Sequence, residues 1–206
     1  MIEQLAPEIL ALSVQHLTMV LIAVSAAVAI AVPAAVLLTR RSGARRWTMS
    51  IVNVVQTIPS LALFGFLLPV PFIGGIGRRT AIVALILYAL LPLVRNTLTG
   101  ILGVDRGVRE SAVAMGMTDR QLLWRVELPL ALPSILAGVR IATVTTIGTA
   151  TIAAAIGGGG LGTFIFRGLA MVNTTTVLAG AVPAALMAIA ADEGLGWFER
   201  RFSWPA

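Results

Sequence analysis

Residues 17–39 read LTMVLIAVSAAVAIAVPAAVLLT, a stretch without a charged side chain. A helix needs about 20 apolar residues to cross the roughly 30 Å hydrocarbon core of a bilayer, so this stretch is predicted to span a membrane. All the spans should be helical, because backbone groups in lipid must find partners within their own segment. Outward along the chain, four more stretches qualify, at residues 48–72, 79–96 (extended toward 101), 133–156 and 175–197.

The composition supports a membrane protein. The 206 residues are 58% hydrophobic and 12% charged, with a mean hydropathy of +0.95, whereas soluble domains carry about 25% charged residues. Cysteine is absent and His16 is the single histidine, which argues against a disulfide framework, a catalytic cysteine and a metal cluster. We expect one membrane domain over residues 1–206, without catalytic residues, bound cofactor or metal.

The basic residues predict the topology. All of them are arginines, and they lie between apolar runs, which favours membrane topology over nucleic-acid binding. Three lie on one predicted side, at Arg78, Arg79 and Arg167, whereas ten lie on the other side, at Arg40, Arg41, Arg45, Arg46, Arg106, Arg109, Arg120, Arg125, Arg200 and Arg201. The excess marks the cytoplasmic side. Five spans then place the N-terminus outside and the C-terminus inside.

The longest polar connection, residues 103–132, falls on the cytoplasmic side and is long enough to suggest a function. Residues 110–115 favour a short helix with Glu110 in its first turn, and Gly116 allows a tight turn. Thr118 or Asp119 can cap a second helix, which is amphipathic with Glu127 on its charged side and ends at Pro129. Such an element either rests on lipid headgroups or docks into a groove on a cytoplasmic partner.

The same loop resembles the signature of ABC importer permeases, which is Glu-Ala-Ala, three residues, Gly, nine residues, Ile, any residue and Leu-Pro. The pattern is matched at Glu110, Ala112, Gly116, Leu128 and Pro129, with mild departures at Ser111 and Val126. The resemblance implies a type I importer permease fold whose loop, at about residues 103–132, docks on an ATPase. Because the chain has no lysine, a Walker A loop is impossible, so ATP and Mg²⁺ should bind a separate subunit.

Softer matches extend over most of the chain. The segments at 56–63 (QTIPSLAL), 88–92 (YALLP), 95–97 (RNT) and 159–162 (GGLG) look like the subfamily that imports glycine betaine, carnitine, choline and proline betaine. This resemblance implies a multi-pass cytoplasmic (inner) membrane protein that works with two ATPase subunits. A second permease subunit, identical or similar, and an extracytoplasmic substrate-binding protein are also implied.

Several polar side chains inside the spans have two readings. Gln56, Thr57 and Ser60 around Pro59, together with Tyr88 and Thr149, either line a translocation path or serve helix packing at a kink. Arg140 and Asp192 are predicted to form a structural ion pair, since charges within a membrane usually pair. The glycine-rich segment 157–162 is interpreted as a flexible outer turn.

Two alternatives to an osmoprotectant importer stay open at this stage. One keeps the permease class and changes the solute, for example to an amino acid. The other is a membrane scaffold that transports nothing, which association with an ATPase would exclude. An intramembrane enzyme is disfavoured, because no nucleophile elbow, histidine pair or aspartate dyad is evident.

Overall fold

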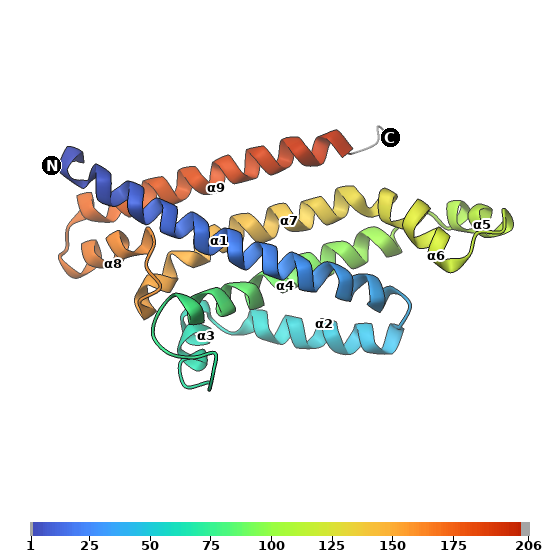
Figure 1. The fold of residues 1–206 in the computed structure, drawn as a ribbon, viewed down its shortest axis with the longest axis horizontal. Coiled ribbons are helices and arrows are strands. Elements are labelled where there is room, and N and C mark those ends of the chain that lie inside the picture. The colour runs from blue at the N-terminus through green and yellow to red at the C-terminus, as the bar shows by residue number, and fades with distance from the viewer. Residues whose placement is uncertain (1, 203–206) are drawn as a thin grey trace.

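The computed structural model of the protein describes residues 2–202, with side chains from residue 6 onward. Within that range every regular element is a helix (Figure 1), which confirms the predicted all-α class. Four helical stretches are long and apolar enough to cross a membrane. Their main helices are α1 (Ile2–Thr39), α4 (Arg78–Leu102), α7 (Leu128–Ala150) and α9 (Thr174–Phe202).

The predicted span at 48–72 is not a single helix, because the chain breaks in its middle. α2 (Ser42–Thr57) and α3 (Ser60–Leu67) meet at a bend of 101°. Ile58 and Pro59 between them have ψ angles of 124° and 137°, which are extended values. Proline disfavours a helical conformation in the residue before it, so Pro59 ends a helix where a kink was expected. Counting the bent pair as one span gives up to five spans.

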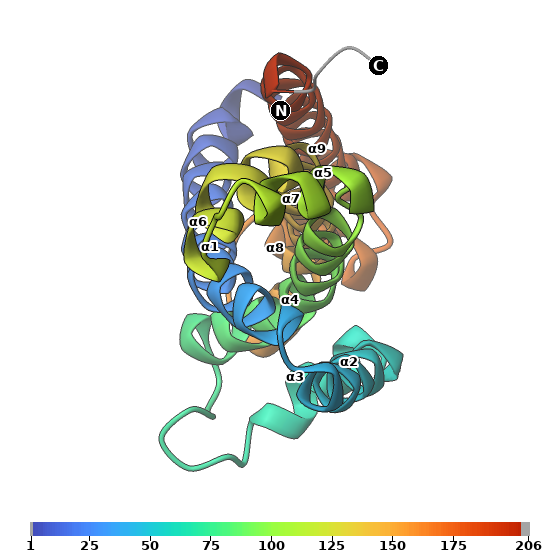
Figure 2. The ribbon, with the colours of Figure 1, turned by 90° about the vertical axis from the view of Figure 1, so that its right-hand side faces the viewer.

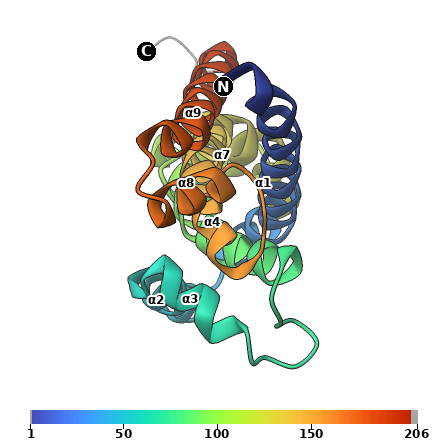
Figure 3. The ribbon, with the colours of Figure 1, turned by 90° about the vertical axis from the view of Figure 1, so that its left-hand side faces the viewer.

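The long helices form a bundle with α4 at its centre. α4 packs mainly against α1 and α7, and α9 packs against α7. The α2–α3 pair lies at the edge of this bundle in both end views (Figures 2 and 3). The first residues of α1 lie at one end of the long axis, and α9 runs away from that end toward its own last turn (Figure 1).

Small residues let these helices approach closely. Ala23, Ala27, Ala31 and Ala35 recur at every fourth position of α1 and are all buried, so they form one stripe along the helix. On α7, a Cβ atom at Gly138 would lie 2.8 Å from the Cβ atom of Asn96 on α4. Close packing of this kind favours helix association in lipid, where the hydrophobic effect does not drive helices together.

The glycine-rich segment after α7 is packed against α1, so its interpretation as a flexible outer turn is wrong in part. A short 3-10 helix, η2 (Ile152–Ile156), precedes it, and α8 (Gly162–Ala170) follows it. Gly160 is buried with φ +76°, and a Cβ atom there would lie 2.9 Å from Nδ1 of His16. The fourth span, predicted at 133–156, therefore ends at Ala150, and the glycine-rich segment that follows lies against α1.

His16 is the side chain that fixes this corner. It is fully buried, and its Nε2 lies 3.0 Å from the carbonyl oxygen of Ile147, to which it donates. The amide of Thr151 bonds to Gly148 at 3.2 Å, in a 3-10 pattern that leaves the carbonyl of Ile147 available. The histidine thus supplies the hydrogen bond that the tightening of the helix end removes.

The start of α8 allows a test of this packing. A Cβ atom at Gly162 would overlap the carbonyl oxygen of Thr151, whereas Gly148 on α7 has no atom within 4 Å of such a position. Gly162→Ala should therefore destabilise the purified protein in detergent by about 1–3 kcal/mol, through overpacking. Gly148→Ala is the matched control and should be neutral or stabilising. Equal thermal midpoints for the two variants would contradict the described packing.

Candidate functional site

The first helix of the loop between α4 and α7 is α5 (Arg106–Ala114), which begins four residues before the predicted start. Its N-cap is Asp105, whose side chain accepts a hydrogen bond from the amide of Val108 at 3.1 Å. Glu110 therefore lies in the second turn, where its Oε1 is 2.7 Å from Nε of Arg106. The favourable acidic group at the helix start is thus Asp105, and the predicted place of Glu110 in the first turn is wrong.

Gly116 makes the turn that follows. Its φ of +82° is positive, as its place in the loop predicts, and no atom lies within 4 Å of where a Cβ would be. The backbone conformation, not the available space, thus favours glycine here. Ala112 is buried beneath the turn, whereas Ser111 is exposed. Thr118 then caps α6 (Asp119–Leu122) through a capping box with Gln121.

The second loop helix does not end at Pro129. A π-helical turn, η1 (Leu123–Glu127), leads directly into α7. In this turn the amide of Leu128 bonds to the carbonyl of Leu123, five residues earlier. A proline provides no amide proton, and its ring conflicts with the carbonyl four residues before it, so a shift in hydrogen-bond register lets Pro129 join the helix. The loop helix and the membrane helix are therefore one continuous element.

A buried carboxylate joins the second part of this loop, η1, to three other elements. Glu127 is 1% exposed, and its Oε2 lies 2.8 Å from a terminal nitrogen of Arg40, just after α1. Its Oε1 is 3.4 Å from Nε of Arg109 on α5. Arg109 also donates to the carbonyl of Ile101 at the end of α4. We call Arg40, Arg109 and Glu127 the Glu127 clamp. The prediction that Glu127 lies on an exposed charged face is wrong. The spacing of residues within the loop helix does not show that Arg40 and Arg109, which are distant in the sequence, enclose its carboxylate.

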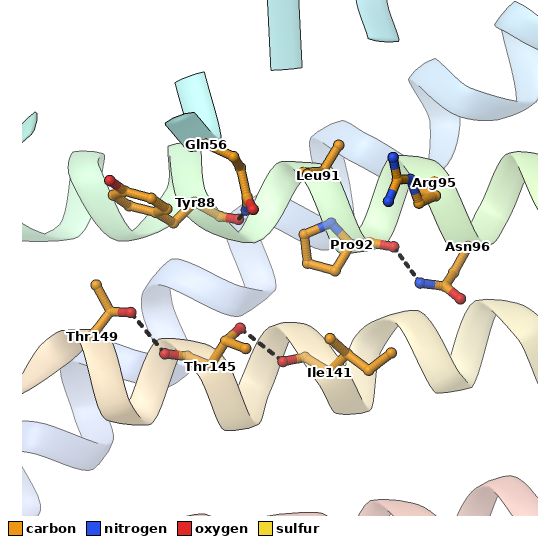
Figure 4. A pocket seen from close by; sticks show the side chains of 9 residues that line it. All are labelled: Gln56, Tyr88, Leu91, Pro92, Arg95, Asn96, Ile141, Thr145 and Thr149. Carbon is orange, nitrogen blue, oxygen red and sulfur yellow. Dashed lines mark hydrogen bonds between the residues drawn. The ribbon is translucent and has the colours of Figure 1, made fainter. Parts of the chain in front are cut away.

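A cleft of about 360 Å³ lies between α4 and α7, with one residue from α2 at its edge (Figure 4). Gln56 donates to the carbonyl of Tyr88 at 2.7 Å, and the Tyr88 hydroxyl donates to the carbonyl of Ile58 at the break between α2 and α3. Pro92 has no amide proton with which to engage Tyr88, so Gln56 satisfies a carbonyl that the proline frees. The cleft is lined by Gln56, Tyr88, Leu91, Pro92, Arg95, Asn96, Ile141, Thr145 and Thr149.

The structure brings together some of the residues expected on a translocation path. Gln56, Tyr88 and Thr149 line the cleft, whereas Thr57 and Ser60 are not among its lining residues. The Thr57 hydroxyl instead donates to the carbonyl of Val54 in its own helix, at 2.7 Å. Sequence reasoning missed Arg95 as a lining residue, although it lies seven positions after Tyr88 and so on nearly the same face of α4.

Arg140 and Asp192 lie together, as the sequence suggests. Nε and a terminal nitrogen of Arg140 lie 2.6 and 2.8 Å from the two carboxylate oxygens of Asp192, which joins α7 to α9 in a two-pronged pair. Glu199, one of the residues that sequence reasoning did not include, is 3.5 Å from Arg140. Its spacing of seven residues from Asp192 places both acids on one face of α9, which is the signal that could have revealed it.

The Glu127 clamp gives a stability prediction. Replacing both arginines, in Arg40→Gln/Arg109→Gln, leaves a buried carboxylate without a cation and should cost on the order of 3–5 kcal/mol. Adding Glu127→Gln removes the stranded charge and should recover most of that loss. The measurement is the thermal midpoint of the detergent-solubilised protein. A triple variant as unstable as the double one would show that the buried charge is not responsible.

Comparison with known proteins places this architecture in a family. Residues 12–204 match the family model described as "Binding-protein-dependent transport system inner membrane component". The chain is 45% identical over 196 residues to the choline transport system permease protein OpuBB of Bacillus subtilis, covering 95% of this chain and 89% of that protein. It is 44% identical to the carnitine transport permease protein OpuCB of Listeria monocytogenes, covering 92% and 85% respectively.

The fold agrees with this assignment. A chain of the MetNI methionine ABC transporter, solved in inward-facing conformations, superposes with a TM-score of 0.89 at 24% identity, covering 99% of this chain and 100% of that one. With its apolar helices and its match over nearly the whole length, the chain is a multi-pass membrane protein that belongs to the family of binding-protein-dependent transport system inner membrane components.

Proposed function

We propose that this protein is the permease subunit of an ATP-driven importer for a small osmoprotectant such as glycine betaine, carnitine, choline or proline betaine. Two cytoplasmic ATPase subunits, which bind ATP and Mg²⁺, dock on the loop formed by α5, α6 and η1. A second permease subunit completes the path through the membrane, and an extracytoplasmic binding protein delivers the solute. The observation that carries the proposal is that the loop formed by α5, α6 and η1 continues into the membrane helix α7 without a break.

The surface of that loop suits a protein partner better than lipid headgroups alone. Met115 and Trp124 are 72% and 61% exposed. Tryptophan, methionine and arginine are enriched at protein interfaces. Beside Trp124 lies a hollow of about 410 Å³, which is lined by Thr118, Arg120, Gln121, Trp124 and Arg125. An ATPase groove would cover these side chains, and the arginines would face acidic groups at its rim.

The connections of the loop provide a way to transmit force. The loop helix continues into α7 without a break, and the Glu127 clamp ties it to the ends of α1 and α4. A displacement of the loop by the ATPase is therefore passed to three membrane helices together. Packed elements of this kind switch between discrete arrangements instead of deforming continuously. Closure of the ATPases would in this way turn the cavity from one side of the membrane to the other.

The solute assignment rests on the relatives, whose names specify choline and carnitine transport. The cleft is consistent with weak, transient contact rather than tight capture. Quaternary ammonium groups are usually held by several aromatic faces, whereas Tyr88 is the one aromatic residue among those lining the cleft. High-affinity selection would then belong to the binding protein. An amino acid is the alternative solute.

The test uses cells that lack their own osmoprotectant uptake and that express the permease with its ATPase and binding protein. Uptake of labelled glycine betaine, carnitine or choline is expected at high osmolarity. Gly116→Val should abolish both uptake and co-purification of the ATPase, because a β-branched residue is strongly disfavoured at φ +82°. Gly116→Asn is the control and should retain both, since asparagine tolerates this conformation.

Three outcomes of this experiment decide between the candidates. Uptake of an amino acid alone would replace the solute and keep the permease assignment. No uptake and no associated ATPase would favour a membrane scaffold. Full ATPase association and uptake in Gly116→Val, at wild-type expression, would contradict the docking role of the loop.

The proposed orientation has a separate test. The chain contains no cysteine, so a single one introduced as Asp119→Cys reports on the loop without background. Asp119 is exposed at the start of α6. We expect a membrane-impermeant maleimide to label it in inside-out vesicles and not in intact cells. Ile76→Cys, at an 84% exposed position in the connection before α4, should show the opposite pattern. Labelling of Asp119→Cys from outside intact cells would reverse the proposed topology.

A further inference from the structure

Arg95 is the one charged residue among those that line the cleft between α4 and α7. It lies within α4, seven residues before Leu102, so it is about 10 Å from that end of the helix. Its side chain is exposed, and within the described part of the chain no carboxylate lies within 4 Å of it. An arginine inside a membrane helix is costly unless it faces water, a partner or a ligand.

The other polar donors of the cleft are already engaged. The Thr145 and Thr149 hydroxyls donate to carbonyls four residues earlier in α7, at 2.8 and 2.9 Å (Figure 4). The Asn96 amide donates to the carbonyl of Pro92 at 2.8 Å, and Gln56 donates to the carbonyl of Tyr88. Among the lining residues that the structure describes, Arg95 therefore holds the main uncommitted donors. A guanidinium offers these donors in a planar fork that matches a carboxylate.

We infer that Arg95 binds the carboxylate of a zwitterionic solute as it passes through the cleft, so that the permease itself favours glycine betaine, carnitine and proline betaine over choline. This inference rests on the proposed function. Tyr88 lies two helical turns away on nearly the same face, about 10 Å along α4, with Leu91 and Pro92 in the interval. The apolar methyl groups of a quaternary ammonium fit that end of the cleft, whereas its carboxylate fits the Arg95 end.

Choline differs from these solutes in the one group that Arg95 recognises. It ends in a hydroxyl, so it cannot form the charge-assisted pair, and its positive charge is repelled by the guanidinium. Removing the charge of Arg95 should therefore have opposite consequences for the two classes of solute. Two other roles for Arg95 predict no such difference: contact with lipid phosphates, and an ion pair with a carboxylate of the second permease subunit.

The test measures binding to the permease–ATPase complex in nanodiscs, without binding protein. The probes are labelled glycine betaine and labelled choline at millimolar concentrations. Arg95→Gln should weaken binding of glycine betaine by roughly tenfold or more, the loss expected for one charge-assisted hydrogen bond. Choline binding should be unchanged or stronger. Arg95→Lys should retain part of the glycine betaine affinity, and Arg46→Gln, which removes an exposed arginine outside the cleft, should have no effect.

Equal weakening for both probes, or no change for either, would overturn the inference, as would a wild-type complex that binds neither. These failures are distinct from failure of the proposed function. If wild-type cells import glycine betaine while Arg95→Gln binds both probes like the wild type, the permease assignment stands and the role of Arg95 is wrong. If wild-type cells import no osmoprotectant, the proposed function fails and this inference fails with it.

Discussion

The structure depends on one constraint: backbone polar groups surrounded by lipid need partners within the protein. At three places where the helical pattern is interrupted, a side chain supplies a hydrogen bond to a free carbonyl. Tyr88 donates to the carbonyl of Ile58 at the broken span, and Gln56 donates to the Tyr88 carbonyl that Pro92 frees. His16 donates to Ile147 where α7 tightens. The hydrogen bonds at Ile58 and Tyr88 also border the cleft, so the same side chains that stabilise the interrupted helices shape the site.

At the loop end of the bundle, the buried carboxylate of Glu127 imposes a similar need for partners within the protein. A buried carboxylate without a cation is strongly destabilising, so Arg40 and Arg109 must stay close to it. This requirement holds the ends of α1, α4 and α5 in a fixed relation to the start of α7. A loop fastened in this manner moves with the membrane helices, which is the property that a coupling element needs.

The cleft combines engaged polar groups with one available cation. Intrahelical hydrogen bonds occupy the threonine hydroxyls, so they present a largely apolar wall. Arg95 then stands out as the group that can discriminate by charge. The external binding protein would provide the affinity for the solute. The membrane cleft would then distinguish solutes by whether they carry a carboxylate. Weak contact suits a transporter, because a solute bound tightly in the path would be released slowly.

The sequence by itself determined the all-helical membrane class, most of the spans, the glycine turn at Gly116 and the proximity of Arg140 and Asp192. These features follow from local composition, from spacing along one helix, or from the cost of an isolated charge in lipid. The tertiary structure decided the break at Pro59, the passage of the helix through Pro129, the burial of Glu127 and the place of Arg95 in the cleft. Each of these depends on a partner distant in the sequence or on a choice between a kink, a break and a π turn. Local propensity leaves that choice open, because packing against other helices supplies the energy that settles it.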